Sequence, residues 1–548
     1  MEKPWLRNWP RYVPKTIEYP EISLGEILVR SAQEAADNVA VRYHDTSLTF
    51  KNLNELVNGF ANSLRILDVK ENDRVAVYLP NIPQFVLAYY AALKIGAVIV
   101  TVNPLYKERE LAIILADSEA KVIITLKRLY PYVQLIRHKT KLEHIIITEG
   151  RSVPPNNLTP HYDVESSSHT ETLAMERLVV KQMGPFEPAK IKPKADLALL
   201  QYTGGTTGIP KGVMLTHYNL VVNAAQFATW LQMRPGQEVH LSALPFSHIY
   251  GMTTSMNAPI YTWSTIVLIP DARDTNVILQ AIDRYEPTIF CGVPGMYTSL
   301  INHPDIKVHS LHSIRVCVSG ATGLAAEVQR KFEELTGGRL IEGYGLTEAS
   351  PVTHVNPLDD WERKRTASIG IPISDTDAKI VDLESGHDLP PETIGELLVR
   401  GPQVMVGYWN NPTETKMVLK DGWLRTGDIG TMDSDGYFRI VDRRKDMINV
   451  SGMKVWPREV EEVLYEHPAV GETAVIGIPD PVSGEAVKAF VVLKEEYRGR
   501  IEAEELSTFC RVRIASYKAP RIIQFLESLP KTSVGKIQRR ELKEGSTE

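Results

Sequence analysis

The alternation of short apolar runs with helical patterns in the second half of this 548-residue chain limits the folds that it can adopt. Strand–helix–strand units with short connections favour parallel strands joined by right-handed crossovers. Ligands of such sheets bind beyond the carboxyl ends of the strands. The predicted strands, each with the glycine loop that follows it, are 288–291 with Gly292, 314–319 with Gly320, and 339–342 with Gly343. We therefore predict that these three loops line one ligand crevice.

The pattern changes beyond residue 353, where short strands and turn signals predominate, with a hairpin turn at 433–436. Residues 447–548 carry enough pattern for a small α+β domain. The charged run 442–446 is a solvated loop on composition alone, but its place before this domain also fits a linker or hinge. The other predicted elements are strands at 97–102, 195–202, 473–477 and 487–493, and helices at 84–94, 325–335 (ended by Gly337), from Pro457, and at 503–513.

Composition excludes several classes of function. Lys and Arg total 61 against 67 Asp and Glu, so the net charge of −6 gives no footprint for nucleic acid, although composition does not exclude a local basic patch. The three cysteines, Cys291, Cys317 and Cys510, are too far apart for a disulfide framework or a thiolate metal site. The apolar stretch 85–102 is interrupted by Lys94, which favours a helix and a buried strand over a transmembrane segment. We expect a cytoplasmic protein, with peripheral membrane contact and a homodimer left open.

The stretch 202–212, Tyr-Thr-Gly-Gly-Thr-Thr-Gly-Ile-Pro-Lys-Gly, follows a predicted strand and is the most informative motif. Its glycines free backbone N–H groups to wrap an anion, its hydroxyls add donors, and its lysine adds a positive charge. This inventory suits a polyphosphate, although the string is not the Walker loop. The alternative is a flexible surface hairpin. The predicted binding residues are Thr203, Gly204, Gly205, Thr206, Thr207, Gly208 and Lys211.

Four other segments follow in the order expected for one family: 244–251 (Leu-Pro-Phe-Ser-His-Ile-Tyr-Gly), 344–348 (Tyr-Gly-Leu-Thr-Glu), 426–428 (Thr-Gly-Asp) and 530–537 (Pro-Lys-Thr-Ser-Val-Gly-Lys-Ile). With these motifs, nearly the whole chain resembles the adenylate-forming superfamily of acyl-CoA synthetases, peptide-synthetase adenylation domains and firefly-type luciferases. The resemblance implies an α/β fold with a large N-terminal AMP-binding domain, 1–441, of several subdomains. Parallel-rich sheets and a β-rich subdomain would form it. A hinge at 442–446 would join it to a small, mobile α+β lid domain at 447–548, with the active site between them.

The same resemblance implies how the nucleotide is bound. Tyr344 would stack on adenine, Thr347 would contact the α-phosphate, and Glu348 would hold Mg²⁺. A single carboxylate with phosphate oxygens is the usual arrangement for this ion. Asp428 and Arg443 would bind the ribose. The remaining residues assigned to ATP or coenzyme A are Gly320, Ala321, Glu342, Gly343, Ser451 and Gly452.

Three residues receive catalytic roles from the resemblance besides Thr347. Lys536 would stabilise the charge shared by the carboxylate and the α-phosphate in adenylation. Lys445 would be the hinge about which the lid rotates between the two half-reactions. His248 would lie beside the substrate carboxylate and the thiol tunnel, although a single histidine is more often structural.

The implied reaction joins a carboxylic acid to AMP from MgATP and then transfers the acyl group to coenzyme A. A medium- or long-chain fatty acid is the predicted acid. Its pocket would be lined by Ile249, Tyr250, Gly320, Gly345, Pro351 and Val352. An aryl-acid ligase of the coumarate type is the main alternative. An amino-acid adenylation domain is disfavoured because no Asp stands beside Ile249 or Tyr250, and a silent acyl-CoA or nucleotide binder because the predicted catalytic residues are present.

Overall fold

The computed structural model describes residues 3–150, 172–179, 186–203, 210–359, 366–451, 453–481, 483–532 and 537–544. Contacts divide the chain into two compact units. The larger comprises Trp5–Asp377 and Arg400–Leu424, and the smaller comprises Met1–Pro4, Ala378–Val399 and Arg425–Glu548. Among the described residues, no helix has the length and hydrophobicity needed to cross a bilayer.

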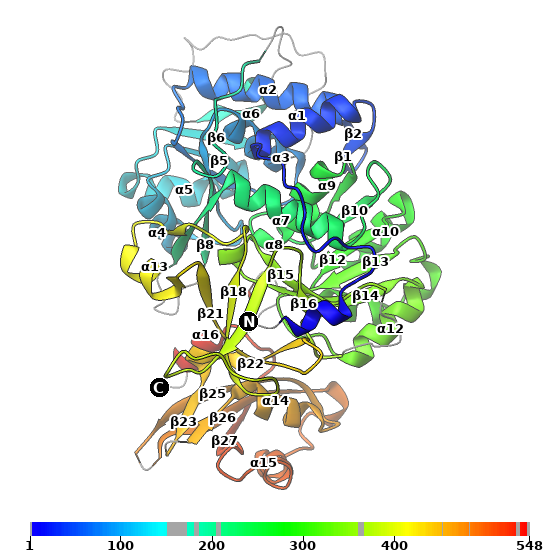
Figure 1. Ribbon diagram of the computed structural model, residues 1–548, viewed down its shortest axis with the longest axis vertical. Helices are drawn as coiled ribbons and strands as arrows, with labels where there is room; N and C mark the ends of the chain where they lie inside the picture. Colours follow the sequence, from blue (N-terminus) through cyan, green and yellow to red (C-terminus); the bar gives the residue numbers. More distant parts are fainter. Residues whose placement is uncertain are drawn as a thin grey trace. The chain divides into compact units, whose positions relative to one another are not determined.

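The first sheet of the larger unit is formed mainly by the first 220 residues or so, in blue and cyan in Figure 1. Its strands pair in parallel except at β9, which runs antiparallel to β8 and β19. The strand order is β19 (Gly407–Tyr408), β9 (Lys211–Thr216), β8 (Leu197–Thr203), β4 (Val98–Thr101), β3 (Arg74–Tyr78), β5 (Val122–Leu126), β6 (His144–Thr148) and β7 (Leu173–Ala174). Helix α3 (Pro83–Lys94) packs with β3 and β4, and α6 (Met175–Leu178) packs with β6 and β7. The helices α1 (Leu24–Glu34) and α2 (Phe50–Ile66) pack on α3, while α4 (Glu108–Ser118) and α5 (Tyr130–Ile136) pack on each other.

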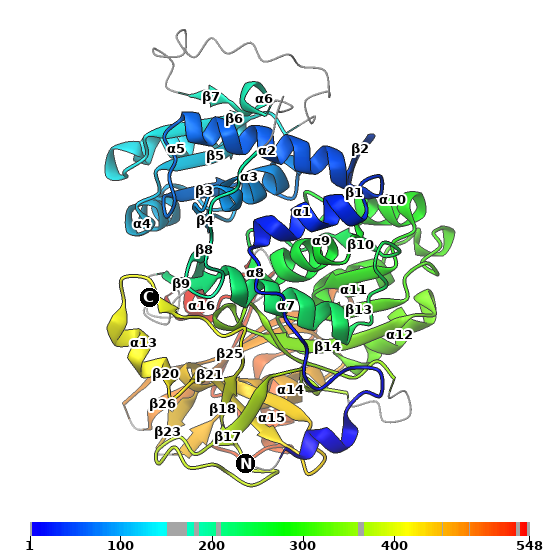
Figure 2. The same cartoon turned by 45° about the horizontal axis from the view of Figure 1, so that its top comes forward.

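The second sheet of the larger unit has nine strands with a parallel centre. Its order is β16 (Ile371–Pro372), β15 (Val352–Val355), β14 (Arg339–Gly345), β13 (Val316–Ser319), β12 (Ile289–Gly292), β10 (Val239–Ser242), β11 (Thr265–Leu268), β1 (Val39–Tyr43) and β2 (Thr46–Thr49). A cluster of buried apolar side chains joins one face to α10 (Thr275–Tyr285), α11 (Pro294–Ile301) and α12 (Ala326–Thr336). Figures 1 and 2 both show α10 and α12 beside this sheet. The helical segment α8 (Ile249–Met252), η5 (Thr253–Asn257) and α9 (Ala258–Tyr261) packs with β10 and with α7 (His217–Trp230).

The predicted strand–helix–strand pattern is confirmed. Strands β12, β13 and β14 are adjacent and parallel, and α12 ends at Gly337, which has a left-handed backbone with φ of 68°. One boundary differs, because β14 continues through Gly343 to Gly345. Its last residues pair antiparallel with β15, which supplies the hydrogen-bonding partners that extend the strand. Gly343 therefore lies inside a strand, whereas Gly292 ends β12 and Gly320 directly follows β13.

The smaller unit contains the predicted hairpin and the α+β pattern. Strands β21 (Trp423–Met432) and β22 (Phe438–Arg443) form an antiparallel pair around the turn at 433–436. A second sheet has the order β24 (Met453–Val455), β23 (Ile448–Val450), β26 (Gly484–Leu493) and β25 (Val470–Asp480), with β27 (Ile522–Phe525) paired to β26. Its apolar core includes residues of α14 (Pro457–Tyr465) and α15 (Ala503–Arg511). The smaller unit also contains β17 (Asp377–Val381), β18 (Gly395–Arg400), α16 (Arg539–Glu544) and the 3₁₀ turns Arg444–Asp446 and Glu495–Tyr497.

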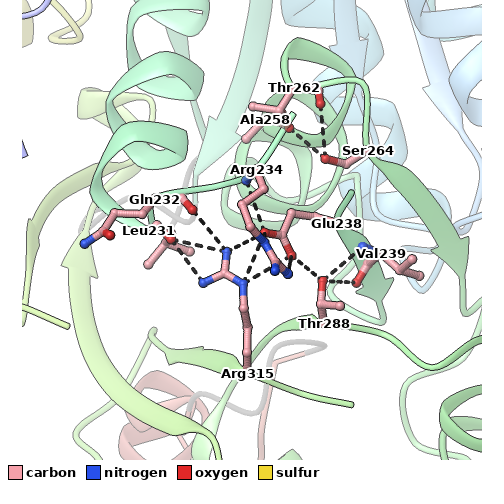
Figure 3. Close-up of polar contacts among 10 residues, drawn as sticks. All are labelled: Leu231, Gln232, Arg234, Glu238, Val239, Ala258, Thr262, Ser264, Thr288 and Arg315. Carbon is pink, nitrogen blue, oxygen red and sulfur yellow. Dashed lines mark hydrogen bonds and ion pairs between the residues drawn. The ribbon is translucent and has the colours of Figure 1, made fainter. Parts of the chain in front are cut away.

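A buried carboxylate ties together the amino ends of three parallel strands in the larger unit (Figure 3). Glu238 precedes β10, Thr288 precedes β12 and Arg315 precedes β13. Glu238, with a side chain 0% exposed, accepts a hydrogen bond from Arg315 Nη2 at 2.7 Å and others from Thr288 and Arg234. Burial alone would raise the pKa of Glu238, but the hydrogen bonds from Arg234, Arg315 and Thr288 lower it to about 2.

We predict that Glu238→Gln lowers the free energy of unfolding of the larger unit by about 3 kcal/mol, because Arg315 would lose the carboxylate that matches its charge. The pKa of the carboxyl is lower in the folded protein than in the unfolded chain. Its contribution is therefore complete above about pH 4.5 and is lost as the pH falls toward about 2. Urea unfolding at pH 7 measures the change. Glu334→Gln, which breaks an exposed pair with Arg330, is the control and should change stability by less than about 0.5 kcal/mol. Equal effects of the two substitutions would contradict this account.

Candidate active site

The carboxyl ends of both parallel sheets of the larger unit hold one loop, residues 243–248, which follows β10. Asn81, just beyond β3, donates hydrogen bonds to the carbonyl oxygens of Ser242 at 2.9 Å and Leu244 at 2.8 Å. Its Oδ1 accepts a hydrogen bond from the N–H of Phe246 at 2.8 Å. From β8, Gln201 donates to the carbonyl oxygen of Ser247 at 3.0 Å. This loop is thus fixed by strand ends of the first sheet while it extends a strand of the second.

His248 ends that loop and caps α8. Its Nδ1 accepts a hydrogen bond from the N–H of Tyr250 at 3.1 Å. An accepting Nδ1 requires the proton of a neutral imidazole to be on Nε2. The half-buried ring therefore has a defined tautomer and orientation, which suits a residue that orients a carboxylate or a thiol.

Tyr250 and Gly320, both predicted to line the acyl pocket, are in contact. The hydroxyl of Tyr250 donates to the carbonyl oxygen of Val318 at 2.8 Å, at the end of β13. A Cβ at Gly320 would lie only 3.0 Å from two ring carbons of Tyr250, so glycine permits this close approach. Burial raises the pKa of Tyr250, so its hydroxyl remains a donor. Ile249 beside it is 1% exposed, and Ala321 after Gly320 is exposed.

The hairpin of β14 and β15 brings the other predicted pocket residues together. Gly345 pairs with Val352, and a Cβ at Gly345 would lie 2.1 Å from the carbonyl oxygen of Pro351. Thr253, in the helical segment that begins after His248, donates a hydrogen bond to the carbonyl oxygen of Ser350 at 2.6 Å. All six predicted acyl-pocket residues therefore belong to two directly connected segments and the end of β13.

The same hairpin carries residues predicted to bind the nucleotide. The ring of Tyr344 lies edge-on to His354 with 5.8 Å between ring centroids. The backbone carbonyl of Glu342 accepts hydrogen bonds from the N–H and the side-chain amide of Asn356. Thr347 and Glu348 lie in a short 3₁₀ turn after the strand. Tyr344 is half-buried, as a residue that offers a ring face to a ligand must be.

A cation and a carboxylate predicted to handle the triphosphate are linked by the segment 405–415, which we call the clasp. Lys211 Nζ donates to Glu414 Oε2 at 2.6 Å and lies 5.4 Å from the centroid of the Tyr408 ring. The hydroxyl of Tyr408 donates to Glu348 Oε1 at 2.7 Å. Burial first, and then the charge of Glu348, raises the pKa of Tyr408, which keeps this donor protonated. One tyrosine thus contacts both predicted charges.

The clasp is attached to the elements that it links. Gly407 and Tyr408 form β19, which pairs with Met214 and Val213 of β9. The N–H of Trp409 donates to the carbonyl oxygen of Gly212 at 2.7 Å. At its other end, the N–H of Met405 donates to the carbonyl oxygen of Glu348 at 2.8 Å. These backbone hydrogen bonds fix the clasp against both β9 and the turn that carries Glu348.

The residues present suit Mg²⁺ bound together with phosphates. Among the described residues, no cluster of three or more His, Cys, Asp or Glu side chains forms a site for an ion on its own. Glu348 offers a carboxylate whose Oε1 is oriented by Tyr408. Mg²⁺ is commonly held by one or two carboxylates together with substrate phosphates, so Glu348 fits that role.

Tyr408 and Glu414 were missed by the sequence analysis. They stand about 200 residues from Lys211 and 60 or more from Glu348 in the chain, and neither belongs to the motifs that carried the resemblance. A lone tyrosine and a lone glutamate give no pattern that distinguishes them from surface or core residues. The pairing of β19 with β9 is what brings them to the site.

The ribose residues predicted from the sequence lie in the smaller unit. Asp428 and Arg443 are opposite each other in β21 and β22, with 2.9 Å between Arg443 Nε and Asp428 Oδ1. The Asp428 side chain is 3% exposed. The N–H of Asp428 donates to Thr426 Oγ1 at 3.1 Å, which shapes the turn around Gly427. Ser451 has a left-handed backbone, and its N–H donates to the carbonyl oxygen of Ser483 at 2.7 Å.

The predicted hinge run is joined to the start of α16 by a half-buried arginine. Arg539 Nη2 donates to both carboxylate oxygens of Glu461, at 2.7 and 2.8 Å. Arg539 Nη1 lies 3.5 Å from Asp446 and 4.0 Å from Asp442. Burial raises the pKa of Asp442 and of Glu461, while the charge of Arg539 lowers them. The ends of the hinge are thus held by the helix that follows the last predicted motif.

Several predicted site residues lie outside the described residues: Gly204, Gly205, Thr206, Thr207, Gly208, Gly452 and Lys536. Lys445 lies in a described 3₁₀ turn at 444–446, but its side chain is outside the description. Thr203, the last residue of β8, pairs with Lys211, the first of β9, so the Gly-rich loop connects two adjacent strands. The roles of all these residues stay predictions.

Comparison with known proteins decides the family. Residues 28–409 match the model of the AMP-binding enzymes, and residues 459–536 match that of the AMP-binding enzyme C-terminal domain. The chain belongs to the AMP-binding enzyme family. It is 44% identical over 560 residues to a long-chain-fatty-acid–CoA ligase of Bacillus subtilis, covering 100% of this chain and 99% of the relative. A ligase of the same name from Yersinia pestis is 40% identical and is covered over 98% of its length, with 99% of this chain matched.

Solved structures agree on the fold. An anthranilate CoA ligase in complex with anthranoyl-AMP matches with a TM-score of 0.84 and 30% identity, over 100% of both chains. The α/β fold class that the sequence predicts is thereby confirmed. As a member of this family, the AMP-binding enzyme uses ATP, Mg²⁺ and coenzyme A.

For this AMP-binding enzyme, we predict that Tyr408→Phe weakens MgATP binding about tenfold, because a hydrogen bond to a charged group that orients Glu348 is lost. Binding of ATP in EDTA should not change. Calorimetry with and without Mg²⁺ measures both affinities. Tyr19→Phe removes a hydroxyl that donates to Asp375 at the same 2.7 Å and serves as the control. A loss of affinity that is equal in EDTA and in Mg²⁺ would show that Tyr408 does not act through Glu348.

Proposed function

We propose that this protein is an AMP-forming ligase that activates a medium- or long-chain fatty acid and transfers it to coenzyme A. The observation that carries the proposal is the clasp, which connects a cation after β8 with a carboxylate after β14. Both charges stand at strand ends, where α/β sheets bind ligands. The similarity to two long-chain-fatty-acid–CoA ligases over nearly their whole lengths supports the choice of acid.

In the first step, an oxygen of the carboxylate attacks the α-phosphorus of ATP and the bond to diphosphate breaks. Lys211 would bind the departing diphosphate, Thr347 would contact the α-phosphate and Glu348 would hold Mg²⁺. The bound ion neutralises charge on the phosphates. Because little covalent chemistry falls to the protein, positioning and charge stabilisation supply the catalysis. Lys536 is proposed to stabilise the charge on the α-phosphate.

In the second step, the thiol of coenzyme A attacks the acyl carbon, loses its proton and expels AMP. We propose that the lid, residues 447–548, rotates about Lys445 between the steps and brings Ser451 and Gly452 to the thiol. In this proposal the N-terminal domain ends at residue 441 and the hinge ends at residue 446. His248 is proposed to orient the reacting carboxylate through its Nε2.

A fatty acid suits the pocket residues better than an amino acid. Tyr250 uses its hydroxyl on the backbone of β13, so it offers the pocket an apolar ring. Ile249 and Val352 are buried apolar side chains, and residues 246–256 contain no acidic residue that would bind an ammonium group. The structural similarity to an anthranilate ligase keeps an aryl acid as the second candidate.

A panel of acids tests the substrate class. Burial of each methylene contributes about 0.8 kcal/mol, so kcat/KM should rise about fourfold per added methylene, or about fifteenfold per added carbon pair, from hexanoate until the pocket is filled. CoA-dependent AMP release is the measurement, with 4-coumarate, anthranilate and phenylalanine as competitors. Higher activity with any of these three acids than with every fatty acid would contradict the fatty-acid proposal.

The two half-reactions test the lysines. Lys536→Ala should lower acid-dependent exchange of diphosphate into ATP roughly a hundredfold, as expected for loss of a transition-state donor. It should spare thioester formation from supplied acyl-adenylate. Lys445→Pro should have the reverse effect, because proline restricts the backbone of the proposed hinge. If either variant lost both half-reactions equally, its assigned role would be wrong.

We also propose a cytoplasmic location, because Cys291, Cys317 and Cys510 are all buried free thiols. Peripheral contact with membranes and a homodimer complete the proposal. Sedimentation with anionic vesicles and light scattering of the purified protein test these two points. Protein that stays in the supernatant would contradict the membrane contact, and the mass of a monomer in light scattering would contradict the homodimer.

A further inference from the structure

The proposed reaction assigns no role to Glu414, the residue that forms an ion pair with Lys211. The two side chains are 14% and 30% exposed, and the distance between their charged atoms is 2.6 Å. Partial burial makes such a pair stronger than an ion pair on an open surface. The lysine proposed to receive diphosphate therefore already has a counter-ion from its own chain.

Glu414 is held where it is by local structure. It stands in the first turn of α13 (Pro412–Val418), and its N–H donates to the side chain of Asn411 at 3.2 Å. Thr415 Oγ1 accepts the N–H of Tyr408 at 2.9 Å and donates to the carbonyl oxygen of Asn411 at 2.9 Å. Since Tyr408 is paired with β9, whose first residue is Lys211, the carboxylate and the ammonium are fixed by one continuous network.

We propose that Glu414 is a resident competitor for Lys211 that limits how tightly the site holds diphosphate. The inference rests on the proposed function. The triphosphate would have to take Lys211 from Glu414 when it binds. After the bond between the α- and β-phosphates breaks, Glu414 would pair with Lys211 again as diphosphate leaves. Glu414 forms no bond to the substrate in this scheme and acts as a positioning residue through Lys211.

The sign of the expected effect follows from charge. A carboxylate beside a site for a polyanion both repels the ligand and neutralises the cation that attracts it. Glu414→Gln retains the size of the side chain and a hydrogen-bond acceptor for Lys211 but removes the charge. We expect diphosphate to bind at least tenfold more tightly to this variant, and the difference to shrink as salt is raised.

Calorimetric binding of diphosphate to the full-length protein, in Mg²⁺ at fixed ionic strength, measures the effect directly. Inhibition of CoA-dependent AMP release by diphosphate gives a second readout, which should strengthen in parallel. In a Lys211→Met background the effect of Glu414→Gln should be clearly smaller, because only the direct repulsion between the carboxylate and diphosphate is then left to remove. Equal or weaker diphosphate binding by Glu414→Gln would overturn the proposal, as would an undiminished effect in the Lys211→Met background.

A matched control is available in the smaller unit. Lys518 and Glu459 form a pair at 2.5 Å with exposures of 21% and 34%, close to those of the Lys211 pair. Glu459→Gln should leave the affinity for diphosphate unchanged. If this variant gained as much affinity as Glu414→Gln, the change in net charge alone would explain the effect, and the proposal would be overturned. If Glu414→Gln failed to fold, Glu414→Asp, whose carboxylate is one methylene shorter, should show a smaller gain. Unchanged or weaker binding by that variant would again overturn it.

The two proposals fail in different ways. A wild-type protein that releases no AMP with any acid would remove the proposed function itself. A wild-type protein that is active, with Glu414→Gln unchanged in diphosphate affinity, would remove only the competitor role of Glu414.

Discussion

Parallel strands end side by side, and this constraint places the candidate residues that follow the central strands of the larger unit. The carboxyl ends of β8, β10, β12, β13 and β14 carry Thr203, the loop to His248, Gly292, Gly320 and the turn to Glu348. Asn81 and Gln201 join the first sheet to the loop of the second. At the amino ends of the strands of the second sheet, Glu238 accepts hydrogen bonds from Arg234 and Arg315. The charged groups at the amino ends of these strands therefore stabilise the fold, while those at the carboxyl ends are placed where a ligand would bind.

Hydrogen bonds within the protein fix the polar groups at the carboxyl ends of the strands before any ligand binds. Tyr250 is fixed to the backbone, so its position does not depend on a substrate. Lys211 and Glu348 lie in different elements, and the clasp holds each by a hydrogen bond of its own. Charges held in place before the reaction cost little reorganisation during it, which is the main source of catalysis by electrostatic stabilisation. The carboxylate of Glu414, which is paired with Lys211, would offset part of the attraction between Lys211 and phosphates.

The sequence predicted the parallel core because each of its local signals agreed with the fold: the glycine stop at 337, the crossover helix and the apolar strands. It did not predict that β14 would run on to Gly345, because that extension depends on pairing with β15. Motifs predicted the residues after β8, β13 and β14, whose spacing is local. Tyr408 and Glu414 could not be found in this way, because their roles depend on the long-range pairing of β19 with β9.

Transfer of oxygen from the acid to AMP tests most directly that a carboxylate attacks the α-phosphorus. Purified protein would be incubated with ATP, Mg²⁺, coenzyme A and hexadecanoate labelled with ¹⁸O at both carboxyl oxygens. The account predicts AMP that carries one ¹⁸O by mass spectrometry, because the bridging oxygen of the acyl-adenylate leaves with AMP when the thiol attacks the acyl carbon. Unlabelled AMP, or label found only in inorganic phosphate together with ADP, would contradict it.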